Sequence, residues 1–469
     1  MKTRTALSLA AAALVALVAP AAAAAHAELI ATTPSDGAVV REAPRAVVLR
    51  FSEPLESSFA TVEVHDPFGR RVDDRQLTRV DPRTLKAPIS RSLSRGTYRV
   101  DWHVVSEDSH PIGGSFLFSV GAPSAGGPVA TAGVGPPDYV NPLFGFVRFL
   151  DFALLLLVAG GAVVVAWPLA AAPPLLRSRL LTLLAAWAGT LIVVALAGIV
   201  LQGAKAGGYG LGDALGWNSI SAVLDTRFGR AWSFQAAAAA LALLLALAAR
   251  TRPGLLPAFV AAGGALVMAP SLSGHAGSGS RLAAVADLAH LAAAAVWTGG
   301  LAVVFVALLT AGAARWELAT TAVPRFSRLA VASVAVLITA GVINAYEELD
   351  SWSQLWETTY GRLLLVKLSL VVPLLALGAY NNRYSVPRLR SAAASPGERR
   401  RFLRSAAGEL ALVVGIVAVT AALVSEPPGR SVQNERRTNE TSRASLPSGA
   451  SAARSQRPSG GASSKPAAR

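Results

Sequence analysis

The chain has 469 residues, of which 53% are hydrophobic, a share that is too high for a soluble protein of this length. It contains no cysteine, which excludes disulfides, thiolate metal sites and cysteine nucleophiles. Its formal net charge of +15 would suit nucleic-acid binding, but the placement of the basic residues favours membrane topology as the cause and predicts no nucleic-acid partner.

Residues 1–25 are typical of a secretory signal peptide. A positively charged start and a short apolar run precede three alanines that end at Ala25. Cleavage after Ala25 makes His26 the first residue, so that its α-amine and its imidazole form one chelate. Cleavage after Ala27 also fits the small-residue pattern and would remove His26. The signal predicts that the following segment lies outside the cytoplasm.

Residues 26–121 are predicted to form an all-β sandwich of Greek-key type, similar to cupredoxin or immunoglobulin domains. Short alternating or apolar runs recur between turn signals rich in proline, glycine and aspartate. About 95 residues are enough to bury one modest core without disulfides. The runs lie at 47–51, 61–65, 97–102 and 115–120.

One loop of this domain carries a carboxylate and an imidazole two residues apart, Asp108 and His110. On an extended chain these side chains point to the same face and can reach one ion. By itself, this pair is weak evidence for a metal site, and two solvated loop residues are the simpler interpretation. A third candidate ligand, His26, far away in the sequence, strengthens the interpretation as a metal site. His65 and His103 have no predicted partner and are interpreted as ordinary strand residues.

The rest of the chain has a different composition. Residues 122–142 are rich in glycine, proline and alanine and are predicted to be a linker. Residues 143–425 are predicted to form an all-α polytopic membrane bundle of eight helices, and residues 426–469 a disordered tail. The predicted spans lie near 143–172, 180–201, 231–249, 254–273, 282–310, 326–346, 361–381 and 403–424.

The loops between these spans differ in charge. Those that follow the first, third, fifth and seventh spans hold many arginines, whereas the opposite loops hold few and include the acidic run 347–350. By the positive-inside rule the arginine-rich loops are cytoplasmic. We therefore expect a multi-pass protein of the cell membrane, in contact with the lipid bilayer, with its N-terminal domain and C-terminal tail both extracytoplasmic.

Ionisable residues at membrane depth are costly and suggest function. Asp287 and His290 are three residues apart on one helical face, and His290 lies about 12 Å inside the fifth span. His275 closes the fourth span, and Met268 precedes it by about two turns. We interpret these four residues as a metal path, with Met268 as a softer ligand or, more simply, as a packing or lipid contact.

Two further charges lie inside the predicted spans. Lys367, in the seventh span, either reaches toward the membrane surface or pairs with a carboxylate such as Glu409 in the eighth. The sequence shows no nucleotide-binding loop, and we expect no nucleotide partner.

These residues resemble two known families. Residues 1–121 resemble the periplasmic copper-binding CopC family, and the spans resemble the CopD copper-transport family. The CopC-like motifs are the processed His26, Thr33-Pro34-Ser35-Asp36-Gly37, Leu49-Arg50-Phe51-Ser52-Glu53-Pro54 and Val105-Ser106-x-Asp108-x-His110-Pro111-x-x-Gly114. The CopD-like motifs are Ser273-Gly274-His275-Ala276, Asp287-x-x-His290, Trp297-x-Gly299-Gly300-Leu301, Arg325-Phe326-Ser327 and Thr359-Tyr360-Gly361-Arg362.

The CopC resemblance implies a Cu(II) site with His26, Asp108 and His110 as ligands and Glu53 as a supporting neighbour. Nitrogen and oxygen ligands suit Cu(II). Some family members also hold Cu(I) with methionines, but residues 26–121 of this chain contain none, so we expect that site to be absent.

The expected function is copper import: the outer domain captures Cu(II) and delivers it to a membrane channel or carrier that is not an enzyme. Copper resistance by sequestration outside the membrane is the nearest alternative. A copper redox enzyme is a second, although Asp108 would fill the position that oxygen needs. A haem-binding membrane protein with His275 and His290 as axial ligands is a third.

Overall fold

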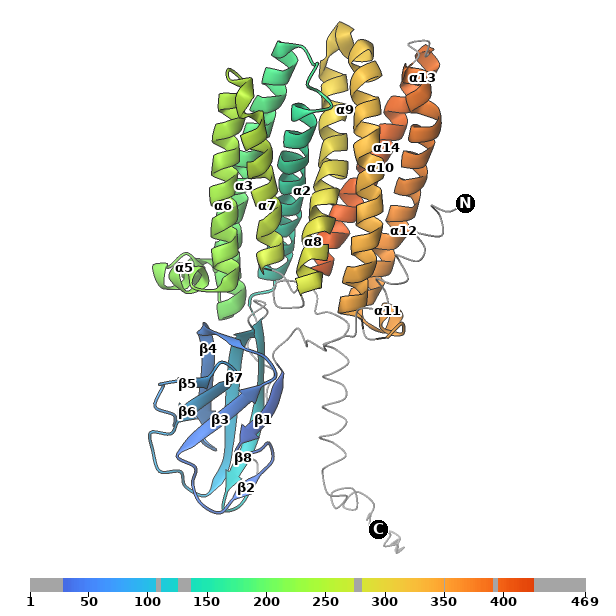
Figure 1. The fold of residues 1–469 in the computed structure, drawn as a ribbon. Coiled ribbons are helices and arrows are strands. Elements are labelled where there is room, and N and C mark those ends of the chain that lie inside the picture. The colour runs from blue at the N-terminus through green and yellow to red at the C-terminus, as the bar shows by residue number, and fades with distance from the viewer. Residues whose placement is uncertain are drawn as a thin grey trace, which may run out of the picture.

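The computed structural model describes residues 28–106, 111–124, 136–273, 281–349, 351–390 and 395–425. Its strands form one body and its long helices pack side by side in another (Figure 1). We call these bodies the β-domain and the helical domain. Every described strand precedes residue 121 and every described helix follows residue 139, which confirms the expected order of a β-domain followed by a helical region.

The β-domain contains two four-stranded sheets. Sheet A has the strand order β1-β3-β6-β5 and sheet B the order β2-β8-β7-β4. The long strands β7 and β8 are antiparallel neighbours over their full length, whereas the short β2 runs parallel to β8. The Greek-key assignment stays a prediction. The strands are β1 Leu29–Thr33, β2 Val39–Val40, β3 Ala46–Phe51, β4 Leu55–His65, β5 Thr78–Asp81, β6 Thr84–Pro88, β7 Gly96–Ser106 and β8 Pro111–Val120.

Alternation along the strands builds the core of this domain. Val47, Leu49 and Phe51 on β3 are fully buried, and the residues between them point away. Side chains of sheet B, among them Tyr98 and Phe118, which stack on each other, meet them in one hydrophobic cluster. The cluster draws on both sheets, so the core lies between them.

The helical domain contains eight helical segments that are long and apolar enough to cross a bilayer, within the part of the chain that is described. Each overlaps one of the spans expected from the sequence. The long helices are α2 Val140–Ala166, α3 Pro174–Gly207, α6 Arg227–Ala249, α7 Leu256–Ser273, α8 Arg281–Ala294, α9 Gly300–Thr310, α10 Arg315–Glu348, α12 Thr359–Tyr380 and α14 Pro396–Leu423. The short helices are α4 Leu211–Ala214, α5 Trp217–Leu224, α11 Gln354–Glu357 and α13 Val386–Arg390, and π-helical turns occur at Ala295–Gly299 (η3) and Asn381–Ser385 (η5).

Helix α2 lies against α3, α7, α14 and the π-helical turn η3, which joins α8 to α9. Glycine permits the closest of these approaches. A β-carbon at Gly160 would lie 1.9 Å from the Ala295 carbonyl oxygen, and one at Gly299 would lie 1.8 Å from the Leu156 carbonyl oxygen. Small residues at such crossings allow helices to pack tightly in lipid, where no hydrophobic effect drives them together.

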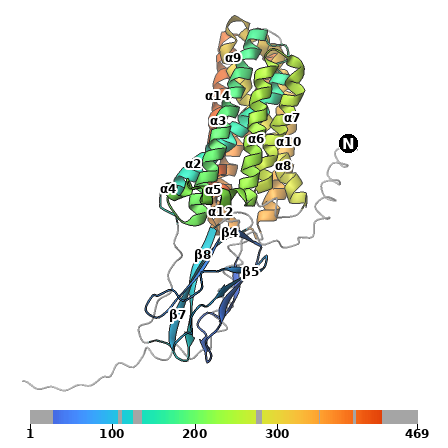
Figure 2. The ribbon, with the colours of Figure 1, turned by 90° about the vertical axis from the view of Figure 1, so that its left-hand side faces the viewer.

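The β-domain abuts one end of the helical domain, below α5 and α6, in both views (Figures 1 and 2). We call this the proximal end; it holds the first turns of α2 and α6 and the last turns of α3 and α7. Phe59 of β4 and Val105 of β7 belong to the hydrophobic cluster of the helical domain, together with Phe144 and Val147 of α2. The two domains therefore share a packed junction.

Candidate metal centre

The three expected Cu(II) ligands, His26, Asp108 and His110, lie outside the described residues, but the chain is described from Glu28 onward and on both sides of the segment with Asp108 and His110. Strand β7 ends at Ser106 and β8 begins at Pro111, so the segment with Asp108 and His110 joins two paired strands. Leu55, at the start of β4, pairs with Ser106. This places the described residues Ser106 and Pro111 at the end of sheet B that faces the helices.

The chain just after His26 is fixed beside the turn that contains Glu53. The Glu28 amide donates a hydrogen bond to Ser52 Oγ, and the Ser52 amide donates one to the Glu28 carbonyl, both at 2.8 Å. Leu29 pairs with Phe51, the last residue of β3. Glu53 is half-buried in the β3–β4 turn and has polar contacts of its own. The start of β1, shortly after His26, and the strand ends on both sides of Asp108 and His110 thus converge on one end of the β-domain.

In the helical domain, Asp287 and His290 lie on α8, about 9 and 13 Å from its proximal start at 1.5 Å per residue. Ser271 Oγ, from the last turn of α7, donates to Asp287 Oδ2 at 2.5 Å. The His290 ring hydrogen-bonds with the backbone of Leu337 on α10. Its Nδ1 is buried and has no hydrogen-bond partner among the described residues.

Lys367 of α12 lies close enough to Asp287 and His290 to interact with both. Its ammonium group interacts electrostatically with both Asp287 and His290, so the carboxylate, the imidazole and the amine form one group from two helices. The expected alternative partner, Glu409, is buried and instead accepts a hydrogen bond from Asn381 Nδ2 at 2.5 Å. The spacing of residues within a span could not reveal which helix faces which.

The remaining residues of the expected membrane path are less informative. Met268 has 43% of its surface exposed, so it lies on the outside of the helical domain, as the simpler interpretation of this residue predicts. His275 lies outside the described residues. Within the described chain no group of three or more His, Cys, Asp or Glu side chains is placed to hold a metal ion.

A second buried polar group was missed by the sequence reasoning. Asp151 of α2 is 3% exposed and accepts a hydrogen bond from Gln235 of α6. One turn earlier, Arg148 interacts electrostatically with Asp151 and donates from Nη1 to the Val424 carbonyl at 3.1 Å. These contacts tie α2 to α6 and to the end of α14. Two charges three residues apart in a predicted span were the available signal.

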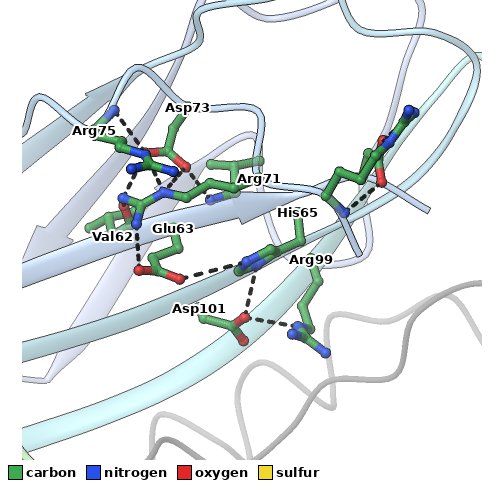
Figure 3. A network of polar contacts seen from close by, with 11 residues as sticks. Val62, Glu63, His65, Arg71, Asp73, Arg75, Arg99 and Asp101 are labelled. Carbon is green, nitrogen blue, oxygen red and sulfur yellow. Dashed lines mark hydrogen bonds and ion pairs between the residues drawn. The ribbon is translucent and has the colours of Figure 1, made fainter. Parts of the chain in front are cut away.

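The histidines of the β-domain both have partners, contrary to expectation. His65 lies between Asp101 and Glu63 on the outer face of sheet B, with Nδ1 3.1 Å from Asp101 Oδ2 (Figure 3). Both carboxylates also contact arginines, Arg99 at 2.9 Å from Asp101 and Arg71 at 2.5 Å from Glu63. The carboxylates are therefore neutralised within the protein, and the network is a cross-strand ladder of ion pairs.

Arg71 also pairs with Asp73, whose side chain is 2% exposed. Burial raises the pKa of Asp73, but hydrogen bonds from Arg71 and from the backbone amides of Val64 and Arg75 outweigh it and hold the pKa below its usual 3.8. Asp66 behaves similarly, because hydrogen bonds from Arg70 and Phe68 overcome its burial and lower its pKa. The charged forms of both groups therefore stabilise the β-domain.

Comparison with known proteins follows the same division of the chain. The CopC domain model matches residues 29–121, the Copper resistance protein D-like N-terminal domain matches residues 139–284, and the Copper resistance protein D model matches residues 320–423. Together these three matches cover the β-domain and most of the helical domain.

Similar proteins include the Copper transport protein CutJ of Bacillus subtilis (strain 168), 28% identical over 373 residues, which are 76% of this chain and 67% of CutJ. The Inner membrane protein YebZ of Escherichia coli (strain K12) is 33% identical over 253 residues, 52% of this chain and 84% of YebZ. Copper resistance protein C of Pseudomonas syringae pv. tomato is 35% identical over 105 residues, 20% of this chain and 81% of that protein.

Proposed function

The chain belongs to the CopC and CopD families of copper resistance proteins, as a fusion of the two, and from this premise we propose that it imports copper across the cytoplasmic membrane. The β-domain lies outside the membrane and captures Cu(II), and the helical domain is a channel or carrier, not an enzyme. The direction of transport is inferred from the resemblance to these families, whereas the signal peptide and the arginine-rich loops support only the orientation, with the proximal end of the helices on the outer side.

Capture in this proposal uses His26, Asp108 and His110. The α-amine and imidazole of a processed N-terminal histidine, a carboxylate and a second imidazole supply nitrogen and oxygen donors, the set that Cu(II) prefers. The supporting observation is that the start of β1, shortly after His26, and the ends of β7 and β8, on both sides of Asp108 and His110, meet at one end of the β-domain.

The observation that carries the transport proposal is the group formed by Asp287, His290 and Lys367. His290 has a buried Nδ1 without a hydrogen-bond partner among the described residues, so its lone pair is available to a metal ion. Asp287, oriented by Ser271, supplies negative charge beside it. Lys367 opposes the arrival of a cation and keeps binding weak enough for the ion to leave again, as conduction requires.

His290→Gln tests this proposal, because glutamine keeps a polar group that can hydrogen-bond with the backbone but is a poor copper ligand. We expect copper accumulation to fall at least tenfold, while Cu(II) binding by the β-domain, followed by electron paramagnetic resonance, stays at one equivalent. His65→Gln is the matched control, since it makes the same change outside the spans and should accumulate copper normally. Normal accumulation by His290→Gln, at normal expression, would show that His290 is structural.

Extracytoplasmic sequestration is the second candidate, because the β-domain is similar over most of its length to a protein named for copper resistance. Sequestration predicts that extra protein lowers cytoplasmic copper and leaves the metal on the β-domain, whereas import predicts that it raises cytoplasmic copper. Copper measured separately in spheroplasts and in the released extracytoplasmic fraction distinguishes the two.

A further inference from the structure

The outward side chains of sheet B change from polar to apolar along the length of the sheet. At the far end, the outward positions of β4 and β7 are polar, and Glu63, His65, Arg99 and Asp101 form the ladder of Figure 3. Near the helices, outward positions become apolar: Val105 is 1% exposed and Phe59 is 8% exposed, both within the hydrophobic cluster of the helical domain. A sheet face that meets water is normally polar, so this end of the face is an interface.

A carboxylate at the same end reaches a helix start. Glu56 pairs with Val105 across the ladder and therefore shares its face of the sheet. Its Oε1 accepts a hydrogen bond at 2.8 Å from the amide of Arg227, the first residue of α6. Amides in the first turn of a helix have no partner within the helix, and negative charge is favourable there. The β-domain thus caps the N-terminus of α6.

An imidazole beside it reaches a helix end. His103, two residues before Val105 on β7, donates from Nε2 to the Ala206 carbonyl at 2.6 Å. Ala206 lies in the last turn of α3, where carbonyls lack partners within the helix and donors or positive charge are favourable. The helices α3 and α6 pack against each other, so opposite helix ends meet opposite partners on one sheet face.

Further contacts connect this junction with the group formed by Asp287, His290 and Lys367. The side chain of Arg227, whose amide Glu56 caps, donates from Nε to the Leu272 carbonyl at 2.7 Å. Leu272 follows Ser271, the residue that donates to Asp287. A continuous series of contacts therefore links β4 to the carboxylate beside His290.

We propose that Glu56, Phe59, His103 and Val105 form a docking patch that fixes the β-domain on the ends of α3 and α6 while copper is delivered. This inference rests on the proposed function. His103 and Glu56 are positioning residues that do not touch copper. Ser106, the last described residue before Asp108 and His110, follows His103 by three positions, about 10 Å of strand. A domain released from the patch would carry the ends of β7 and β8 away from the helices.

The Arg227 amide provides a direct readout of docking by hydrogen exchange in the full-length protein. We compare a docking pair of substitutions, Phe59→Ala and His103→Ala, with the matched pair Phe68→Ala and His65→Ala, which removes the same two residue types away from the helices, Phe68 being 81% exposed. Glu56 is kept in both pairs, because it accepts the hydrogen bond from the Arg227 amide and its loss would speed exchange without any undocking. Losing the His103 contact should weaken docking about fivefold, and losing the buried Phe59 ring as well should weaken it roughly another tenfold or more. We expect exchange at Arg227 to accelerate in the docking pair only.

Copper accumulation is measured on the same proteins, with Cu(II) binding by electron paramagnetic resonance as a check on the β-domain. We expect the docking pair to bind one Cu(II) but to accumulate copper at least fivefold more slowly, and the matched pair to resemble wild type. Equal exchange at Arg227 in the wild type and the docking pair would overturn the inference. So would faster exchange with normal accumulation. If the wild type itself accumulates no copper, the proposed function fails, while the exchange data still report docking.

Discussion

Gly299→Ala should destabilise the helical domain, because the glycine allows η3 to touch α2. The added β-carbon would lie 1.8 Å from the Leu156 carbonyl oxygen and 2.5 Å from the Leu156 carbonyl carbon. Unstrained contact needs about 3.5 Å, so the two segments must separate by roughly 1.5 Å. The two segments are almost equally close at Gly160, whose β-carbon would lie 1.9 Å from the Ala295 carbonyl oxygen. A small shift of η3 along α2 therefore cannot remove the clash.

Overpacking of this kind costs typically about 1–3 kcal/mol, and backbone atoms cannot rotate away as a side chain can. We therefore expect the upper end, about 3 kcal/mol, and a fall in the apparent melting temperature of roughly 5 °C or more. The assay is loss of the monodisperse peak in size-exclusion chromatography after heating the detergent-solubilised protein.

Gly264→Ala is the matched control, since a β-carbon at Gly264 of α7 has no described atom within 4 Å. Alanine is the better helix former, so this variant should melt at or slightly above the wild-type temperature. If Gly299→Ala melts within about 1 °C of wild type, the close approach of η3 and α2 is not the reason for glycine at this position.

Three further predictions concern the β-domain. Because the folded pKa of Asp73 and Asp66 is lowered, their contribution to stability is present above the unfolded pKa of about 4 and is lost as pH falls through the folded pKa; urea unfolding followed by circular dichroism between pH 6 and 3 should show this loss, and Asp73→Asn should reduce it. The exported chain should begin at His26 in N-terminal sequencing, and a start at Glu28 would contradict the expected copper site. The β-domain should bind one Cu(II) tightly and Cu(I) poorly in competition titrations, with affinity falling as pH drops through the histidine range; tight Cu(I) binding would contradict the nitrogen and oxygen ligand set.

The broad division of the chain was predictable because hydrophobic periodicity records what each segment packs against. The four expected strand runs fall in β3, β4, β7 and β8, which line the core between the sheets. Two of the strands that the sequence did not indicate, β2 and β5, carry a weaker pattern: all four residues of β5 are exposed, and β2 has only two residues. Edge strands of this kind have no buried face, so apolar and polar residues do not alternate in their sequences.

Contacts between distant segments were not predictable from spacing. Asp287 and His290 were identified because they share a helix face, but Lys367 lies 80 residues beyond Asp287 on another helix. His103 looked like an ordinary strand residue, because its partner is a backbone carbonyl of α3. In hindsight, Val105 and Phe59 at outward positions were the sequence signal for the docking patch, since they interrupt a polar face.

Copper import itself is tested most directly by the rate at which radioactive copper enters the cytoplasm. Cells that lack the gene, cells that carry it and cells that carry it with His290→Gln are compared at equal external copper, with cytoplasm separated from the extracytoplasmic fraction. Import by way of His290 predicts rapid cytoplasmic accumulation only in cells with the wild-type chain. Equal cytoplasmic rates in all three strains, or lower cytoplasmic copper in cells with the wild-type chain, would contradict it.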